Sequence, residues 1–166
     1  RLAPVPDAFL LDEIAADAIA HFHPDTFWLG HPSDDGVGDG NTSSYMGAAG
    51  VIWALDYLHR IGATSVAEDF RPVLPKLLQR TITDFESNSP PDYGKHGSLL
   101  VGDMGTALVA MRLAPTPVLA DLVHTRAQAN SELPIRELMW GMPGSMLAAI
   151  HMAEMTQEPR WRSLFK

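Results

Sequence analysis

Histidine and carboxylate side chains are the groups in this chain that could bind a metal ion or move a proton. The sequence has 7 histidines, 20 aspartates and glutamates, and no cysteine. Without cysteine, a disulfide and a thiolate-bound zinc site are both excluded. A metal site in this chain would therefore need histidines or carboxylates at ligand spacing.

Four histidines are candidates for such a site. His21 and His23 are two residues apart and would point to different sides of a helix, which favours surface or capping roles over shared metal binding. His96, followed by a glycine, has no cysteine neighbour and is expected to be an ordinary loop residue. His151 falls in an expected apolar helix and could face a cavity.

Three groups of carboxylates could also do chemistry. Asp34, Asp35, Asp39 and Asn41 alternate with glycines as in a calcium loop, but the closing glutamate is missing and a solvated loop is expected. Asp103 is expected to cap a helix, with a position at the mouth of a cavity as the alternative. A carboxylate such as Glu137 in the first turn of a helix ordinarily compensates the helix dipole.

A short motif recurs three times at the start of an apolar stretch, with two glycines separated by two residues. The copies are Gly47-Ala48-Ala49-Gly50, Gly102-Asp103-Met104-Gly105 and Gly141-Met142-Pro143-Gly144. Aligning the second glycines also superposes the apolar stretches that follow them. A repeated helical unit must bury its apolar side against its neighbours, so the motif predicts a helical repeat.

Glycine at these places has two explanations. A residue without Cβ can take a positive φ and lets another backbone or a ligand come close. Three helix N-termini on one side of an assembly could present free N–H groups as a floor for anionic or polar ligands. Tight helix packing without a ligand is the simpler explanation.

Periodicity and breaker residues divide the chain into helices and leave no alternating β pattern. The expected helices cover residues 7–20, 47–60, 65–85, 98–113, 117–130 and 137–155, and residues 160–166 resemble the start of another. Thr64 or Ser65 is expected to cap the third helix, whose start two prolines would delay. The sequence therefore predicts an all-α fold of helical hairpins, each pairing an inner helix that follows a glycine motif with an outer helix.

Composition limits the class of protein. With 166 residues, 46% of them hydrophobic, the chain can form one domain with a real core. Its net charge of -8 argues against nucleic-acid binding. No signal peptide and no apolar run of membrane-spanning length is evident, so a soluble, cytoplasmic protein is expected. The Arg at position 1 and an uncapped C-terminal helix suggest a fragment.

Three segments resemble the lanthionine synthetase C-like proteins, a family that includes the bacterial lantibiotic cyclases and their eukaryotic glutathione-binding relatives. They are SYMGAAGV at 44–51, LLVGDMG at 99–105 and ELMWGMPGSMLAA at 137–149, and the third is the most specific. The resemblance implies an α/α toroid (α/α barrel) of about seven helical hairpins around a central cavity. Residues 1–166 would form about the first three hairpins, as a single all-α domain.

The same resemblance implies a chemistry for the intact relatives. In the cyclases, zinc activates a peptide thiolate that adds to a dehydroamino acid and forms a thioether (lanthionine). The zinc ligands, two cysteines and a histidine of later repeats, would lie beyond residue 166. No cofactor is therefore expected in this chain, which alone should be inactive. Zinc is expected only in a full-length relative.

The resemblance also assigns residues and partners. Glu137 takes the place of an acidic residue in the cyclases and would handle protons as the catalytic candidate. The cavity wall and its support would be formed by Gly47, Gly50, Gly102, Asp103, Gly105, Trp140, Gly141 and Gly144. The implied partners are the remainder of the toroid or a second copy, and a peptide or glutathione-like thiol. Neither nucleic acid nor a membrane is expected as a partner.

Two other functions remain open from the sequence. The chain could be a stand-alone helical-repeat module that binds a peptide or a protein. It could also belong to another α/α-toroid enzyme, such as a carbohydrate-active one. Glycosidic chemistry usually needs two carboxylates at a controlled separation.

Overall fold

A computed structural model describes residues 8–31, 33, 39–88 and 99–165 of the chain. These residues form helices and no β-strand; one isolated bridge pairs His23 with Phe27. The helices are α1 (Ala8–Ala20), α2 (Ala48–Arg60), η1 (Arg71–Val73), α3 (Leu74–Asn88), α4 (Asp103–Leu113), α5 (Pro117–Asn130), α6 (Met142–Thr156) and α7 (Arg160–Ser163). The predicted all-α class is confirmed.

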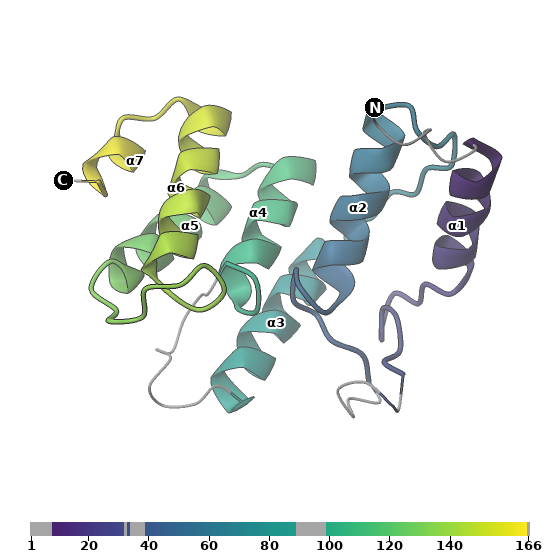
Figure 1. Cartoon of the computed structure of the whole chain (residues 1–166), viewed down its shortest axis with the longest axis horizontal. Coiled ribbons are helices and arrows are strands. Elements are labelled where there is room, and N and C mark those ends of the chain that lie inside the picture. The colour runs from purple at the N-terminus through teal and green to yellow at the C-terminus, as the bar shows by residue number, and fades with distance from the viewer. Residues whose placement is uncertain (1–7, 32, 34–38, 89–98, 166) are drawn as a thin grey trace, which may run out of the picture.

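The helices are arranged in two layers (Figure 1). In the front row α6, α4 and α2 stand side by side, and each begins at the lower end of the view. Behind this row α3 and α5 run in the opposite direction, and α1 stands at the right-hand edge. The helices that follow the three glycine motifs therefore form one layer, and we call them the inner helices; α3 and α5 are called the outer helices.

Local signals explain where several helices begin and end. The side chain of Thr116 accepts a hydrogen bond from the N–H of Leu119, and Pro117 occupies the first turn, so α5 begins where predicted. Gly62, with a φ of 73°, ends α2 in the left-handed region that glycine favours. α2 and α5 have the predicted bounds to within one residue.

Three predicted helix starts are wrong. Thr64 and Ser65 cap no helix, because their hydroxyl groups donate to the carboxylate of Asp12 and the helical segment begins only at Arg71. α4 begins at Asp103 and not at residue 98, and α6 begins at Met142 and not at residue 137. In both cases the preceding residues form a loop that closes against the glycines.

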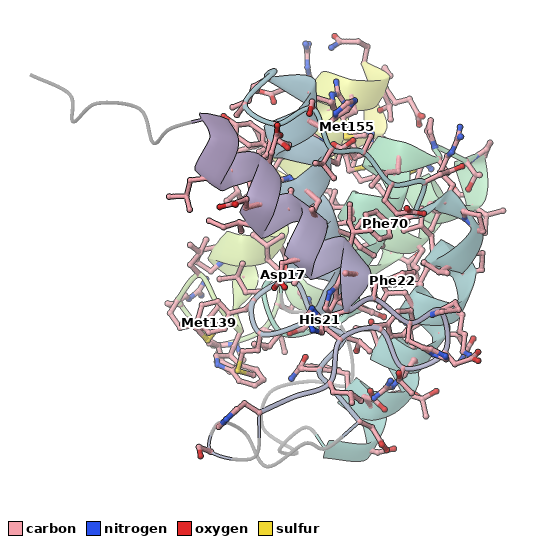
Figure 2. All side chains as sticks on the ribbon, turned by 90° about the vertical axis from the view of Figure 1, so that its right-hand side faces the viewer. Asp17, His21, Phe22, Phe70, Met139 and Met155 are labelled. Atoms are coloured by element: carbon pink, nitrogen blue, oxygen red, sulfur yellow. The ribbon has the colours of Figure 1, made fainter. Side chains whose placement is uncertain are left out.

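Buried apolar side chains form two clusters. The larger cluster joins α4, α5, α6 and α7 around Met104, Met152 and Trp161, which are fully buried. The second cluster joins α2 to Phe70 and Leu77 and reaches Ala15 on α1. Figure 2 shows Phe22 and Phe70 together beside the C-terminal end of α1, and their rings meet edge to face with centroids 5.2 Å apart.

Two buried hydrogen bonds tie the inner helices to the outer helices. Thr106 on α4 and Thr81 on α3 share a bond of 3.3 Å between their hydroxyl oxygens. Asn130 on α5 donates to the hydroxyl of Ser145 on α6 at 3.0 Å. Thr106 and Ser145 each directly follow a second glycine, so two units of the repeat use the same position to contact the outer layer. Among the described helices, none is long and apolar enough to cross a bilayer.

Candidate functional site

The three glycine motifs have one backbone conformation. Gly47, Gly102 and Gly141 are the N-caps of α2, α4 and α6, with φ of -150°, -99° and -108° and ψ of -160°, -166° and -172°. These angles are extended and open to any residue, so the positive φ considered from the sequence is not the reason for glycine here. The repeat is nevertheless real in three dimensions.

Close approach of the backbone explains the second glycine of each motif. A Cβ on Gly50, Gly105 or Gly144 would lie 2.3, 2.1 or 2.2 Å from a carbonyl oxygen six residues earlier in the chain. The three oxygens belong to Ser44, Leu99 and Leu138. No side chain fits at such distances, so each loop folds back tightly over the first turn of its helix. We call residues 41–50 and 135–144 and the described residues 99–105 the glycine loops.

At the N-termini of α2 and α6, N–H groups that the sequence suggested for an anion-binding floor are already used within the glycine loops. The N–H groups of Ala48 and Ala49 donate to the carbonyls of Asn41 and Thr42, at 2.9 and 3.2 Å. The N–H of Met142 donates in the same way to the carbonyl of Ile135, at 3.2 Å. The first and third glycine loops thus satisfy donors of their own helices, which favours tight packing as the explanation of the motif.

A groove of about 550 Å³ runs across the layer of inner helices. The three helices contribute Gly50, Trp53, Gly105, Leu108, Val109, Arg112, His151, Glu154 and Met155, and the glycine loops contribute Ser44, Leu99 and Leu100. Most of these residues are apolar, and Trp53 and Met155 are each 45% exposed. The groove is a candidate site for an apolar ligand or a peptide side chain.

Polar groups lie at one end of the groove. Arg112 donates from Nε to Oδ2 of Asp56 at 2.7 Å, which ties α4 to α2. Nδ1 of His151 lies 3.9 Å from Oε2 of Glu154 on α6, and both side chains are more than half exposed. This end of the groove can therefore donate and accept hydrogen bonds, and His151, which the sequence placed near a possible cavity, is among the residues that line it.

Aligning the units reveals a layer of residues that sequence reasoning missed. Tyr57, Arg112 and His151 each stand seven residues after a second glycine, so each inner helix presents a polar or aromatic residue at the same height. Tyr57 stacks on Trp53, with ring centroids 5.3 Å apart and planes 10° apart. The aligned repeat already contained this signal, because the three residues occupy the same position about two helical turns after the second glycines.

Glu137 is exposed and lies in the third glycine loop, before the first turn of α6. Its carboxylate accepts hydrogen bonds from the N–H groups of Met139, at 2.7 Å, and Trp140. In the first glycine loop Ser43 stands at the same position, and its hydroxyl accepts from the N–H of Met46 at 3.2 Å. Glu137 therefore stabilises the loop through these hydrogen bonds. The prediction that it lies in the first turn of the helix is wrong, because α6 begins at Met142.

Asp103 is 1% exposed and turns toward the outer layer. Its Oδ2 lies 2.9 Å from Nε of Arg126 on α5, and this ion pair is the most buried of those found among the described residues. Asp103 occupies the first turn of α4, but its side chain does not line the groove. Trp140 lies in the third glycine loop and is half-buried.

The remaining metal-ligand candidates do not come together. No group of three or more His, Asp or Glu side chains capable of holding a metal ion occurs in the described part of the chain. His21 lies just after α1 and bonds back to the carbonyl of Asp17, while His23 accepts from the N–H of Asp25. Asp34, Asp35 and His96 lie outside the described residues. The residues described here do not fit a zinc ion.

Comparison of the chain with family models, curated proteins and solved structures found no match. The geometry of the glycine loops and of the groove is therefore the basis for any functional conclusion.

Proposed function

We propose that this chain forms the first three helical hairpins of a lanthionine synthetase C-like toroid and that the groove across α2, α4 and α6 is part of the wall of its central cavity. The observation that carries the proposal is the groove itself, which is lined by all three helices that follow a glycine motif. Its apolar lining and few polar groups suit a peptide with apolar side chains.

The thiol chemistry of the proposed family needs zinc, which would generate a thiolate near neutral pH. The donor set of this chain does not fit zinc, because the sequence has no cysteine and the described residues bring no three ligands together. In this proposal the chain holds and orients a peptide, and later hairpins supply the reacting centre. Glu137 would support the third glycine loop beside that centre.

Peptide binding can be measured on this chain alone. A fluorescently labelled, cysteine-containing apolar peptide should raise its anisotropy as the chain is added. Trp53→Ala and Met155→Glu should weaken binding at least several-fold, because both side chains line the groove and are half-exposed. Val118→Glu is the matched control, since Val118 is 77% exposed on α5 and does not line the groove. Equal affinity of all four proteins would contradict a groove-bound peptide.

The stand-alone binding module is the second candidate, and the same groove favours it. The mass of the endogenous protein separates the two functions. A product much larger than 18.1 kDa supports the toroid, and a product of this mass supports the module. Glu154 is the one carboxylate among the described residues that line the groove, so the paired acids of a carbohydrate-active enzyme are not found there.

A further inference from the structure

The first two glycine loops contact the next unit through the same position. The residue six places before a second glycine is Ser44 in the first unit, Leu99 in the second and Leu138 in the third. The Ser44 hydroxyl lies 2.2 Å from the Cβ position of Gly105, and Cβ of Leu99 lies 3.0 Å from that of Gly144. Leu138 has the same position in the third unit and is 48% exposed.

The inner helices differ in the same way: residues that are buried on α2 and α4 have more exposed counterparts on α6. On α2, Ala49 and Ile52 are fully buried, and on α4 the aligned Met104 and Ala107 are fully buried too. The aligned residues of α6 are Pro143 and Met146, which are only half-buried. One turn further on, Met111 of α4 is 4% exposed and the aligned Ile150 is 43% exposed. We call Leu138, Pro143, Met146 and Ile150 the downstream face.

The first unit exposes the other side of the repeat, the positions by which α4 and α6 pack on the preceding unit. Gly50, Ala54 and Leu58 on α2 are only half-buried. At the position of Ala54, Val109 of α4 is 4% exposed and packs with the cluster of α2, and Ala148 of α6 is fully buried in the larger cluster. The atoms nearest to the Cβ position of Gly50 belong to Ser44 of its own loop, whereas those nearest to Gly105 and Gly144 include atoms of the preceding unit. We call Gly50, Ala54 and Leu58 the upstream face.

We propose that a second copy of this chain binds head to tail, with its upstream face packed on the downstream face of the first copy. The contact would continue the α2–α4 and α4–α6 interfaces, in which most of the same positions are already buried. Both faces are apolar, and burying them removes exposed hydrophobic surface. Because the two faces differ, the interface is heterologous and produces chains or rings of copies.

Sedimentation velocity of the 166-residue chain at rising concentration tests this interface. We expect the wild-type protein to form multiples of its 18.1 kDa mass. Ile150→Glu blocks the downstream face and Ala54→Glu blocks the upstream face, so each variant alone should be a monomer. An equimolar mixture should form a one-to-one dimer and nothing larger, since each partner keeps one intact face. Val118→Glu, on the exposed side of α5, should associate like the wild type.

A wild-type monomer at every concentration would overturn the proposal, as would variants that still associate or a mixture that stays monomeric. Circular dichroism checks that each variant is folded, and Ala54→Gln replaces Ala54→Glu if the charged variant unfolds. The inference rests on the internal register of the repeat and applies to the stand-alone module, because in the proposed toroid the next hairpin would cover the downstream face. A monomer would therefore leave the peptide-binding result unaffected, and absence of peptide binding would leave the measured mass unaffected.

Discussion

The hydroxyl of Ser44 lies against Gly105 and donates hydrogen bonds of 3.0 Å to the carbonyls of Leu99 and Leu100. One serine thus fixes the first glycine loop on the second. The N–H of Tyr45 adds a bond of 2.9 Å to the carbonyl of Leu100. The two units are therefore joined by directional hydrogen bonds where the loops meet and by apolar contacts where the helices meet.

Replacing Gly105 or Gly144 by alanine should destabilise the fold by about 1–3 kcal/mol, because the new Cβ would overlap a carbonyl oxygen and a side chain of the preceding unit. Urea unfolding followed by circular dichroism measures this. Gly62→Asn is the control, because nothing lies within 4 Å of its Cβ position and asparagine tolerates a positive φ. A control that is as unstable as the Gly105 variant would show that steric overlap is not the cause.

Removing one partner of the Asp103–Arg126 pair should cost about 3–5 kcal/mol, because it leaves a buried charge without its counter-ion. The double variant Asp103→Leu with Arg126→Met should cost less than the sum of the two single changes. A double-mutant cycle in urea gives this coupling. The exposed pair Asp69–Arg71 is the control and should couple by less than about 1 kcal/mol. Additive effects at Asp103 and Arg126 would contradict the prediction.

Glu137→Ala should destabilise the third glycine loop by about 0.5–2 kcal/mol, as expected for the loss of a capping side chain. Glu137→Ser should retain most of the stability, since Ser43 caps the equivalent N–H in the first loop. Thermal unfolding of both variants decides this. Glu132→Ala is the control, because Glu132 is an exposed glutamate nearby in the chain. If serine is no better than alanine, the two loops are not closed in the same way.

The pKa of Asp12 is held below the usual range of aspartate, first by the hydrogen bond from the Thr64 hydroxyl and then by those from Ser65. A lowered pKa in the folded state gives stability that is present above the unfolded pKa of about 3.9 and is lost as the pH falls through the folded pKa. Thr64→Ala should therefore raise the pKa of Asp12, and its stability deficit should shrink below about pH 4.

Carboxyl NMR titration of Asp12 and urea midpoints at neutral and acidic pH measure both effects. Thr83→Ala is the control, because the Thr83 hydroxyl donates to the carbonyl of Gln79 in its own helix and not to a carboxylate. A pKa of Asp12 that stays unchanged in Thr64→Ala would show that the hydroxyl does not hold the carboxylate.

The sequence predicted the helical layers well and the helix starts less well. Glycine and Pro117 mark the bounds of α2 and α5 in the chain itself. The starts of α4 and α6 could not be predicted from periodicity, because apolar residues such as Leu99 and Leu138 match a helical pattern but lie in loops that contact the next unit or remain exposed. Where α4 and α6 begin depends on tertiary packing, about which the periodicity of the sequence carries no information.

Some of the residues that line the groove were singled out from the sequence. His151 and the second glycines were expected near a cavity, and Gly50, Gly105 and His151 line the groove. The partner of Asp103 could not be predicted, because Arg126 is distant in sequence and only the packing of α5 on α4 brings the two together. Glu137 was assigned by resemblance, and its bonds to Met139 and Trp140 depend on a loop conformation that residue types do not specify.

Thr106 and Ser145 each link an inner helix to the outer layer, but the aligned residue of the first unit is Val51, which has no hydroxyl group. The second and third units therefore have a buried hydrogen bond that resists local opening, and the first unit depends on apolar contact alone at this position. Amide protons of α2 should exchange with solvent faster than those of α4 and α6. The array would then unfold from its first unit, and α4 to α6 would be the last part to lose structure.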